Sequence, residues 1–188
     1  MRIIGGSKKG FPLKHPKAAN VRPTTDMIKE ALFNILQPIE GKTFLDLFAG
    51  TGNVGIEALS RGASQVVFIE KNIGLARSIK DLAKQLGFEG NARVISMDVK
   101  KGLLQLSTPN IKFDYVFIDP PYQKALISDT IEGIDQSGLL AQDSLIVVQH
   151  SKREPVHLTD KGYSLEDQRT YGDSMLTFIK IKTQADNN

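Results

Sequence analysis

Two segments of this 188-residue chain could hold and modify a nucleoside, and the first is Asp119-Pro120-Pro121-Tyr122. Two consecutive prolines restrict the backbone strongly, so this corner is preorganised. The Asp119 carboxylate and the Pro120 carbonyl could then both accept hydrogen bonds from one exocyclic NH2 group and aim its lone pair at a methyl donor. Tyr122 would offer the base a ring to stack on. We predict these four residues as catalytic; a proline turn with a capping aspartate is the structural alternative.

The second segment is a glycine-rich turn within FLDLFAGTGNVG, at 44–55. Gly50, Gly52 and Gly55 form G-x-G-x-x-G, in which the missing Cβ atoms allow positive φ and let a ligand approach the backbone. Glu70 ends the next apolar run. A carboxylate at that point, about twenty residues after the first glycine, can accept hydrogen bonds from ribose hydroxyls. The combination predicts a nucleoside site rather than a merely structural turn.

Asp46 favours one nucleoside over another. It precedes Gly50 by four residues, and a carboxylate there suits a ligand with sulfonium and ammonium groups but is unfavourable beside a pyrophosphate. This favours S-adenosylmethionine over NAD, as does the lack of room for a dehydrogenase's substrate domain. Asp98 could bind an adenine amino group, cap a helix at Val99–Leu106, or do both. The predicted cofactor-binding residues are Asp46, Phe48, Gly50, Thr51, Gly52, Asn53, Glu70, Lys71, Asp98 and Val99.

Alternating strands and helices are predicted to bring these segments to one edge of a sheet. The apolar runs typical of buried strands are Thr43–Phe48, Gln65–Glu70, Ala92–Met97, Phe113–Ile118 and Ser144–Gln149. Helical patterns between them favour a parallel sheet covered on both faces, and ligands gather at the carboxyl ends of its strands. A last run, Met175–Lys182, alternates inside and outside, which predicts a strand entering antiparallel at or near the edge.

Helix ends are marked by capping and breaking residues. Thr24 or Thr25 can cap a helix beginning at about Asp26, and Pro38 and Gly41 end it. Two further helices have predicted asparagine caps. Asn53 follows the glycine turn, and Asn72 begins the clearest helix, which Gly87 ends.

Composition excludes several classes of protein. With 40% hydrophobic and 24% charged residues, the chain is neither disordered nor collagen-like. There is no cysteine, so a disulfide framework and a thiolate nucleophile are excluded, and the scattered His15, His150 and His157 lack metal-ligand spacing. No apolar run approaches the roughly 20 residues that cross a bilayer, and the N-terminus has no apolar signal core. We expect a soluble, cytoplasmic protein without a metal.

The basic residues are concentrated at the N-terminus. Residues 1–22 contain no acidic side chain and carry Arg2, Lys8, Lys9, Lys14, Lys17 and Arg22. A segment this one-sided suggests a polyanionic partner such as nucleic acid, and a solvated basic tail is the alternative. We predict these six residues as RNA-binding; Arg22 could instead orient the corner at 119–122.

These motifs together resemble class I S-adenosylmethionine-dependent methyltransferases that act on amino groups. More narrowly, the chain resembles the bacterial 16S rRNA guanine-N2 methyltransferases, the RsmD family. The matching segments are RIIGG near the start, RPTTDMIKEALFNIL at 22–36, FLDLFAGTGNVGIEALSRGA at 44–63, FIEKN at 68–72, DPPY at 119–122 and the late RTYGDSMLTFIK. The glycine turn and DPPY are shared with many methyltransferases, so the 22–36 stretch and the basic arm narrow the family.

The resemblance implies a Rossmann-like α/β fold with a seven-stranded, mostly parallel sheet, an antiparallel last strand, helices on both faces and a small basic N-terminal β-hairpin arm. It assigns cofactor binding to Asp46, Gly50, Gly52, Glu70 and Asp98, and the target guanine amine to the corner at 119–122. It also implies a methyltransferase domain at 23–183, after the basic arm at 1–22, and the polar end at 184–188 is expected to fray. The implied partner is 16S rRNA, preferably in the assembled small ribosomal subunit; we expect a monomer with no membrane or metal partner.

Three other functions fit parts of the pattern. A DNA adenine-N6 methyltransferase shares DPPY but would normally add a domain that reads duplex DNA. A nicotinamide oxidoreductase shares the glycine turn. A non-catalytic RNA-binding or assembly factor would be expected to lack DPPY or the glycine turn, and both are present.

Overall fold

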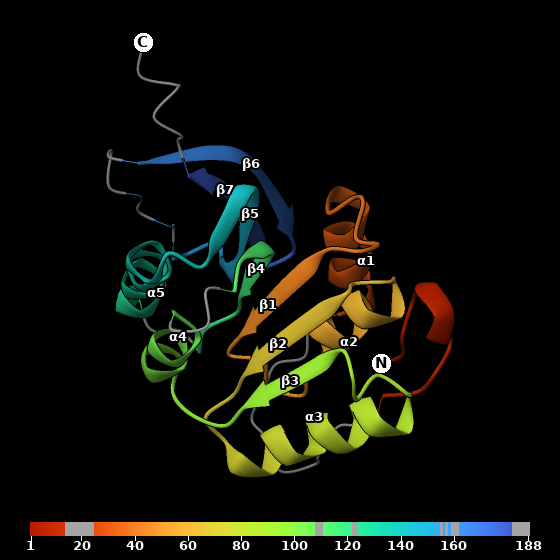
Figure 1. The fold of residues 1–188 in the computed structure, drawn as a ribbon. Coiled ribbons are helices and arrows are strands. Elements are labelled where there is room, and N and C mark those ends of the chain that lie inside the picture. The colour runs from red at the N-terminus through yellow and green to blue at the C-terminus, as the bar shows by residue number, and fades with distance from the viewer. Residues whose placement is uncertain are drawn as a thin grey trace.

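The structure is a computed structural model that describes residues 1–13, 25–107, 111–121, 124–154, 156, 158 and 162–181. Within this part of the chain, one sheet has the strand order β3-β2-β1-β4-β5-β7-β6 (Figure 1). Its strands are β1 (Thr43–Leu47), β2 (Gln65–Ile69), β3 (Ala92–Ile95), β4 (Phe113–Ile118), β5 (Leu140–Ser151), β6 (Tyr163–Tyr171) and β7 (Ser174–Ile181). The predicted mostly parallel, seven-stranded α/β fold is confirmed.

Strand direction follows the connections. β1 to β5 pair in parallel, because a helix joins each of these strands to the next one along the chain and so returns the chain to the same end of the sheet. β7 pairs antiparallel with both β5 and β6. The antiparallel strand predicted from the last apolar run is therefore confirmed. It lies one position inside the edge, and β6, which the strand patterns did not predict, forms the edge itself.

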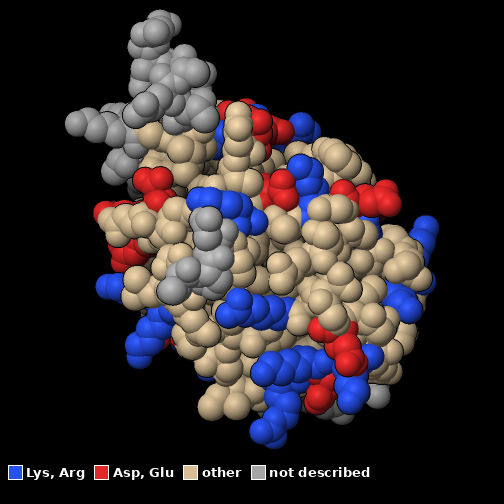
Figure 2. Space-filling view, in the orientation of Figure 1, with Lys and Arg blue, Asp and Glu red and all other residues tan. Residues whose placement is uncertain are grey.

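Helices cover both faces of the sheet (Figure 1). One core cluster contains side chains of α1 (Asp26–Ile35), α2 (Asn53–Ser60) and α3 (Ile73–Gln85). The other contains side chains of α4 (Val99–Ser107) and α5 (Lys124–Ser137). Two predicted caps are confirmed: Thr25 Oγ1 accepts from Ile28 N in α1, and Asn72 Oδ1 accepts from Leu75 N in α3. Figure 2 shows basic and acidic side chains interspersed over one face, with several basic ones at its lower end, where Figure 1 draws α3.

Residues 1–13, here called the N-terminal hairpin, fold back on themselves and join the core. Arg2 bridges to Pro12 in antiparallel fashion, with a short 3-10 helix, η1 (Gly6–Lys8), at the bend. Ile3 is completely buried and Leu13 nearly so, both in the cluster that contains α1 and α2. This described part of the basic arm is therefore packed against the domain and is not a solvated tail.

A buried charged network attaches the hairpin. Glu57 on α2 accepts hydrogen bonds from the backbone N–H groups of Ile4 (2.9 Å) and Gly5 (2.7 Å) and from Nε of Arg61 (2.9 Å). The Lys29 ammonium on α1 lies 3.6 Å from Glu57 and donates to the Arg2 carbonyl at 2.6 Å. Both Lys29 and Glu57 are fully buried, so each charge depends on its partners.

Candidate active site

The glycine turn follows β1 and contains three residues with left-handed backbone conformations. These are Phe48 (φ 59°), Gly50 (φ 56°) and Gly52 (φ 77°). Glycine adopts such angles without a Cβ penalty, whereas a bulky residue such as Phe48 does so rarely. Backbone strain of this kind is concentrated at ligand-binding and catalytic sites, which supports a functional rather than a purely structural turn.

The third glycine allows α2 to pack tightly on β2. A Cβ on Gly55 would lie 2.2 Å from Cε1 of Phe68 and 2.9 Å from Cγ1 of Val66. A Cβ on Gly52 would also lie 2.9 Å from Ile79 of α3. The three glycines of the motif thus shape the turn and set the distance between helix and sheet, as their spacing predicts.

Asp46 supplies the cap of α2 from inside the sheet. Its buried side chain accepts from Gly55 N at 2.9 Å, which satisfies one of the free N–H groups at the helix N-terminus. The prediction that Asn53 caps this helix is wrong. The N-cap is Gly52, and Asn53 is the first helical residue, whose Nδ2 lies 3.5 Å from Sδ of Met1.

Glu70 ties the end of β2 to the turn. Its Oε2 accepts from Gly50 N at 2.8 Å and its Oε1 from Asn72 N at 2.7 Å. An ionised carboxylate offers about four lone-pair sites, so each oxygen keeps acceptor capacity after these bonds. The Glu70 side chain is thereby fixed, and it can still receive hydroxyl donors.

Asp119 follows the last residue of β4 and lies close enough to Asp46 to influence it. The pKa of Asp46 is raised to about 8, mainly by burial and also by the negative charges of Asp119 and Glu70, while the hydrogen bond from Gly55 N lowers it. The structure thus brings together three carboxylates that the sequence predicts as site residues. Such excess negative charge next to a glycine turn fits a cationic ligand.

The other predicted site residues differ in their exposure and contacts. Pro120 is partly exposed and Pro121 is exposed, while Tyr122 lies outside the described residues. Asp98 caps α4 by accepting from Lys101 N at 3.0 Å, so its predicted capping role is confirmed and its adenine contact stays a prediction. Thr51 in the glycine turn and Val99 at the start of α4 are partly exposed. Lys71, which follows β2, is exposed.

The six predicted RNA-binding residues divide into two groups. Arg2 and Lys9 are exposed on the N-terminal hairpin, and the Lys8 ammonium lies 5.9 Å from the centre of the Phe88 ring. Lys14, Lys17 and Arg22 lie outside the described residues.

Sequence analysis missed Gln149 as a candidate. Ile118 and Val148 are the last registered pair of β4 and β5, and Asp119 and Gln149 each follow that pair. The Gln149 side chain is buried, and its Oε1 has no hydrogen-bond partner among the described residues. An unpaired buried polar atom costs about 1–3 kcal/mol, which makes Gln149 a candidate site residue. Only the strand pairing reveals this position, because Gln149 belongs to no motif.

Comparison with known proteins gives the family. A family model described as Conserved hypothetical protein 95 matches residues 1–180. Ribosomal RNA small subunit methyltransferase D of Escherichia coli K12 is 35% identical over 190 residues, covering 100% of this chain and 93% of that protein. The chain belongs to the RsmD-type methyltransferase family. Putative rRNA methyltransferase YlbH of Bacillus subtilis is also 35% identical to this RsmD-type chain, over 92% of it and 94% of the relative.

Solved structures agree with this assignment. The putative methyltransferase yhhF from Escherichia coli superimposes on the RsmD-type chain with a TM-score of 0.86 at 31% identity, covering 98% of this chain and 99% of that one. A putative methyltransferase, SMU.776, solved with SAH, has a TM-score of 0.65 at 16% identity. The match covers 82% of this chain and 48% of that one. That more distant similarity shows the Rossmann-like methyltransferase fold. No described helix of the RsmD-type chain is long and apolar enough to cross a membrane.

Proposed function

We propose that this protein transfers a methyl group from S-adenosylmethionine to the exocyclic N2 amine of a guanine in 16S rRNA, within the assembled small ribosomal subunit. The observation that carries the proposal is the position of Asp119, whose charge acts on Asp46 beside the glycine turn. A corner suited to an NH2 group and a group of carboxylates suited to a cation therefore share one edge of the sheet. The rRNA methyltransferase names of relatives at 35% identity support RNA as the substrate.

Asp46, Glu70 and the turn at Gly50 and Gly52 would hold S-adenosylmethionine. When bound, it supplies an electrophilic methyl group on a positively charged sulfur. The carboxylates of Asp46, Glu70 and Asp119 provide the negative charge that stabilises this cation. Glu70, already fixed by Gly50 N and Asn72 N, can accept from ribose hydroxyls with its remaining lone pairs.

Asp119 and Pro120 would position the guanine amine. An exocyclic amine is a poor nucleophile because its lone pair is delocalised into the ring. Two acceptors that hold its hydrogens favour a pyramidal nitrogen and aim the lone pair at the methyl group. Because aligned reactants at about 3–3.5 Å gain several kcal/mol of barrier reduction, positioning by this rigid corner accounts for most of the catalysis, and no covalent enzyme intermediate is needed. The new bond from N2 to the methyl carbon would replace the bond from sulfur to that carbon, and the cationic amine would then release its extra proton to water.

Binding of the methyl donor should depend on pH through Asp46. Its pKa of about 8 in the ligand-free protein means that Asp46 is largely protonated at pH 6. A sulfonium cation favours the ionised form, so the affinity for S-adenosylmethionine should rise as pH increases from 6 to 8 and then level off. S-adenosylhomocysteine has a neutral sulfur and should show a weaker rise. Isothermal titration of both ligands across this range measures the ratio of their affinities, in which effects of their shared amino and carboxyl groups cancel.

Asp46→Asn is the matched control for this titration, because an amide oxygen can still accept from Gly55 N. In this variant the ratio of the two affinities should not change with pH. A ratio that stays constant in the unmodified protein as well would contradict the placement of the sulfonium next to Asp46.

The proposed substrate is tested by offering labelled S-adenosylmethionine with three acceptors: small ribosomal subunits lacking this modification, naked 16S rRNA and duplex DNA. We expect label in the subunits, less in naked rRNA and none in DNA. Label in the duplex DNA alone would favour a DNA methyltransferase instead, and no label in any acceptor would oppose methyl transfer to nucleic acid.

A further inference from the structure

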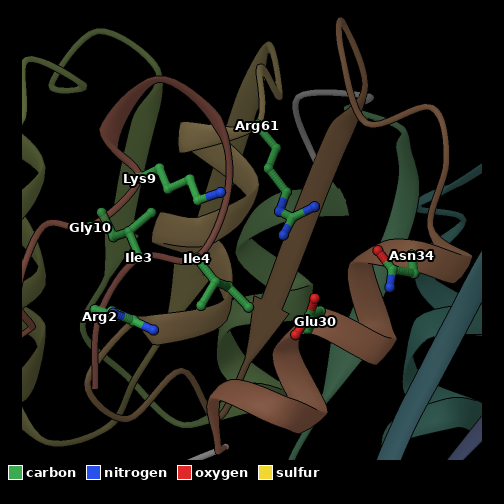
Figure 3. Close-up of a pocket in the computed structure, with 8 residues that line it drawn as sticks. All are labelled: Arg2, Ile3, Ile4, Lys9, Gly10, Glu30, Asn34 and Arg61. Atoms are coloured by element: carbon green, nitrogen blue, oxygen red, sulfur yellow. The ribbon is translucent and has the colours of Figure 1, made fainter.

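A hollow of about 320 Å³ lies between the N-terminal hairpin, α1 and the end of α2. It is lined by Arg2 and Lys9 of the hairpin, by Glu30 and Asn34 of α1, and by Arg61, the residue after α2 (Figure 3). Pockets for small organic ligands commonly have volumes of about 300–1,000 Å³. The hollow is thus large enough for one nucleotide, and its lining differs from that of the candidate active site.

Arg61 is held rigidly at this hollow. Its Nε donates to Glu57 at 2.9 Å, and its guanidinium lies 4.9 Å from the centre of the Phe33 ring. The backbone of Gly5 closes the other side, since a Cβ there would lie 2.5 Å from Cζ of Arg61. Only 17% of the Arg61 side chain is exposed. The guanidinium is therefore fixed before any ligand arrives.

The outer nitrogens of this guanidinium make no hydrogen bond within the described part of the chain. Among the described residues, the same holds for the charged ends of Arg2 and Lys9. Figure 3 shows these three basic groups and the Glu30 carboxylate turned toward the same space. Arg61 is already paired with Glu57, but Arg2 and Lys9 outnumber Glu30, so the hollow keeps a net positive charge. The planar Arg61 fork matches the geometry of two phosphate oxygens.

We propose that this hollow binds one nucleotide of the substrate RNA, at a distance from the modified guanine. Its phosphate pairs with the free side of Arg61 and with Arg2 and Lys9. Glu30 and Asn34 face its sugar and base, where a carboxylate can accept from a ribose 2′-hydroxyl, a group that distinguishes RNA from DNA. This inference rests on the proposed function, because it takes RNA as the partner.

Arg61 links the hollow to the candidate active site through α2. α2 begins at the glycine turn and ends next to Arg61 after eight residues, which corresponds to about 12 Å. A nucleotide held at the hollow would therefore be anchored to the same helix whose N-terminus lies at the glycine turn. Anchoring the strand there would favour RNA binding without altering the methyl-transfer chemistry.

Three variants test the hollow separately from the catalytic edge. Arg61→Lys keeps a positive charge for Glu57 but loses the planar fork, Lys9→Ala removes an exposed cation, and Glu30→Gln removes the carboxylate. Lys180→Ala, on β7 toward the other edge of the sheet, is the matched control. Filter binding of 16S rRNA and steady-state methylation of small subunits are measured for each, together with S-adenosylhomocysteine affinity and the urea midpoint as folding controls.

For Arg61→Lys we expect RNA affinity to fall at least tenfold, with KM rising similarly and kcat staying within about threefold. Lys9→Ala should also weaken binding and reduce the slope of log affinity against log salt by roughly 0.7, the value for one contact to a single strand. Glu30→Gln should reduce the preference for RNA over DNA of the same sequence. The control and the S-adenosylhomocysteine affinities should match those of the unmodified protein.

Two results would overturn the proposal. The first is that Arg61→Lys and Lys9→Ala have the same RNA affinity and the same KM as the control Lys180→Ala. The other is micromolar binding of free GMP or inorganic phosphate that does not compete with RNA, which would assign the hollow to a free nucleotide or anion. If the unmodified protein binds rRNA but methylates none, and the variants lose that binding, the proposed function fails while the hollow remains an RNA subsite.

Discussion

Asp119→Ala should lower kcat for methylation of small subunits by about a thousandfold or more, because a lost charge-stabilising contact at the reacting group alone costs about 10²–10³-fold. In the proposed function, Asp119 is the acceptor that orients the amine, and no other described carboxylate follows β4 at this edge. Binding of S-adenosylhomocysteine should change by less than about threefold, since Asp46 and Glu70 keep their contacts with the turn. Single-turnover methylation and isothermal titration measure the two quantities.

Asp119→Asn refines this test. The amide oxygen can still accept one hydrogen bond from the base, but the charge that stabilises the developing cationic amine is lost. Its activity should lie between those of the alanine variant and the unmodified protein. Loss of methylation together with loss of S-adenosylhomocysteine binding, in either variant, would mean that the corner serves the cofactor or the fold rather than the target base.

Glu57→Ala should have the largest effect on stability, lowering the free energy of unfolding by about 3–5 kcal/mol, the range for breaking a buried ion pair. The substitution leaves the fully buried Lys29 ammonium without its partner on α2 and frees the N–H groups of Ile4 and Gly5. Because the free energy of unfolding of a domain is only about 5–15 kcal/mol, this loss would be a large fraction of it. Urea unfolding that shifts in midpoint at an unchanged m value measures the loss.

Glu166→Ala provides the comparison, because Glu166 is an exposed carboxylate that pairs with Lys180 at 3.6 Å. An exposed pair contributes about 0–1 kcal/mol. Equal unfolding free energies for the Glu57 and Glu166 variants would show that the hairpin is not held by the buried network.

The strands and the chemical motifs could be predicted from sequence because their signals are local. β4 has the predicted bounds, and β1 to β3 begin at the predicted residues and end one or two residues earlier. Apolar runs between polar residues fix these strands whatever lies around them. The turn at Gly50 and Gly52 likewise follows from the residues themselves, since glycine adopts positive φ without a Cβ penalty.

Features that depend on distant contacts could not be predicted in this way. β6 is largely polar and exposed, and only its pairing with β7 makes it a strand. Glu57 and Lys29 have the pattern of charges on solvated helix faces, and they become buried because the N-terminal hairpin, more than fifty residues from Glu57, covers them. Proximity in sequence predicts Asn53 as the cap of α2, whereas the fold supplies the capping side chain from Asp46.

The most direct test of the proposed function is the identity of the methylated atom. Small subunits lacking the modification are incubated with the protein and S-adenosylmethionine, and the rRNA is digested to nucleosides for mass spectrometry. The proposed geometry at Asp119 predicts one N2-methylguanosine per 16S rRNA, absent with Asp119→Ala. Methylation of a ring carbon or of a ribose hydroxyl, neither of which needs two acceptors for an amine, would contradict it.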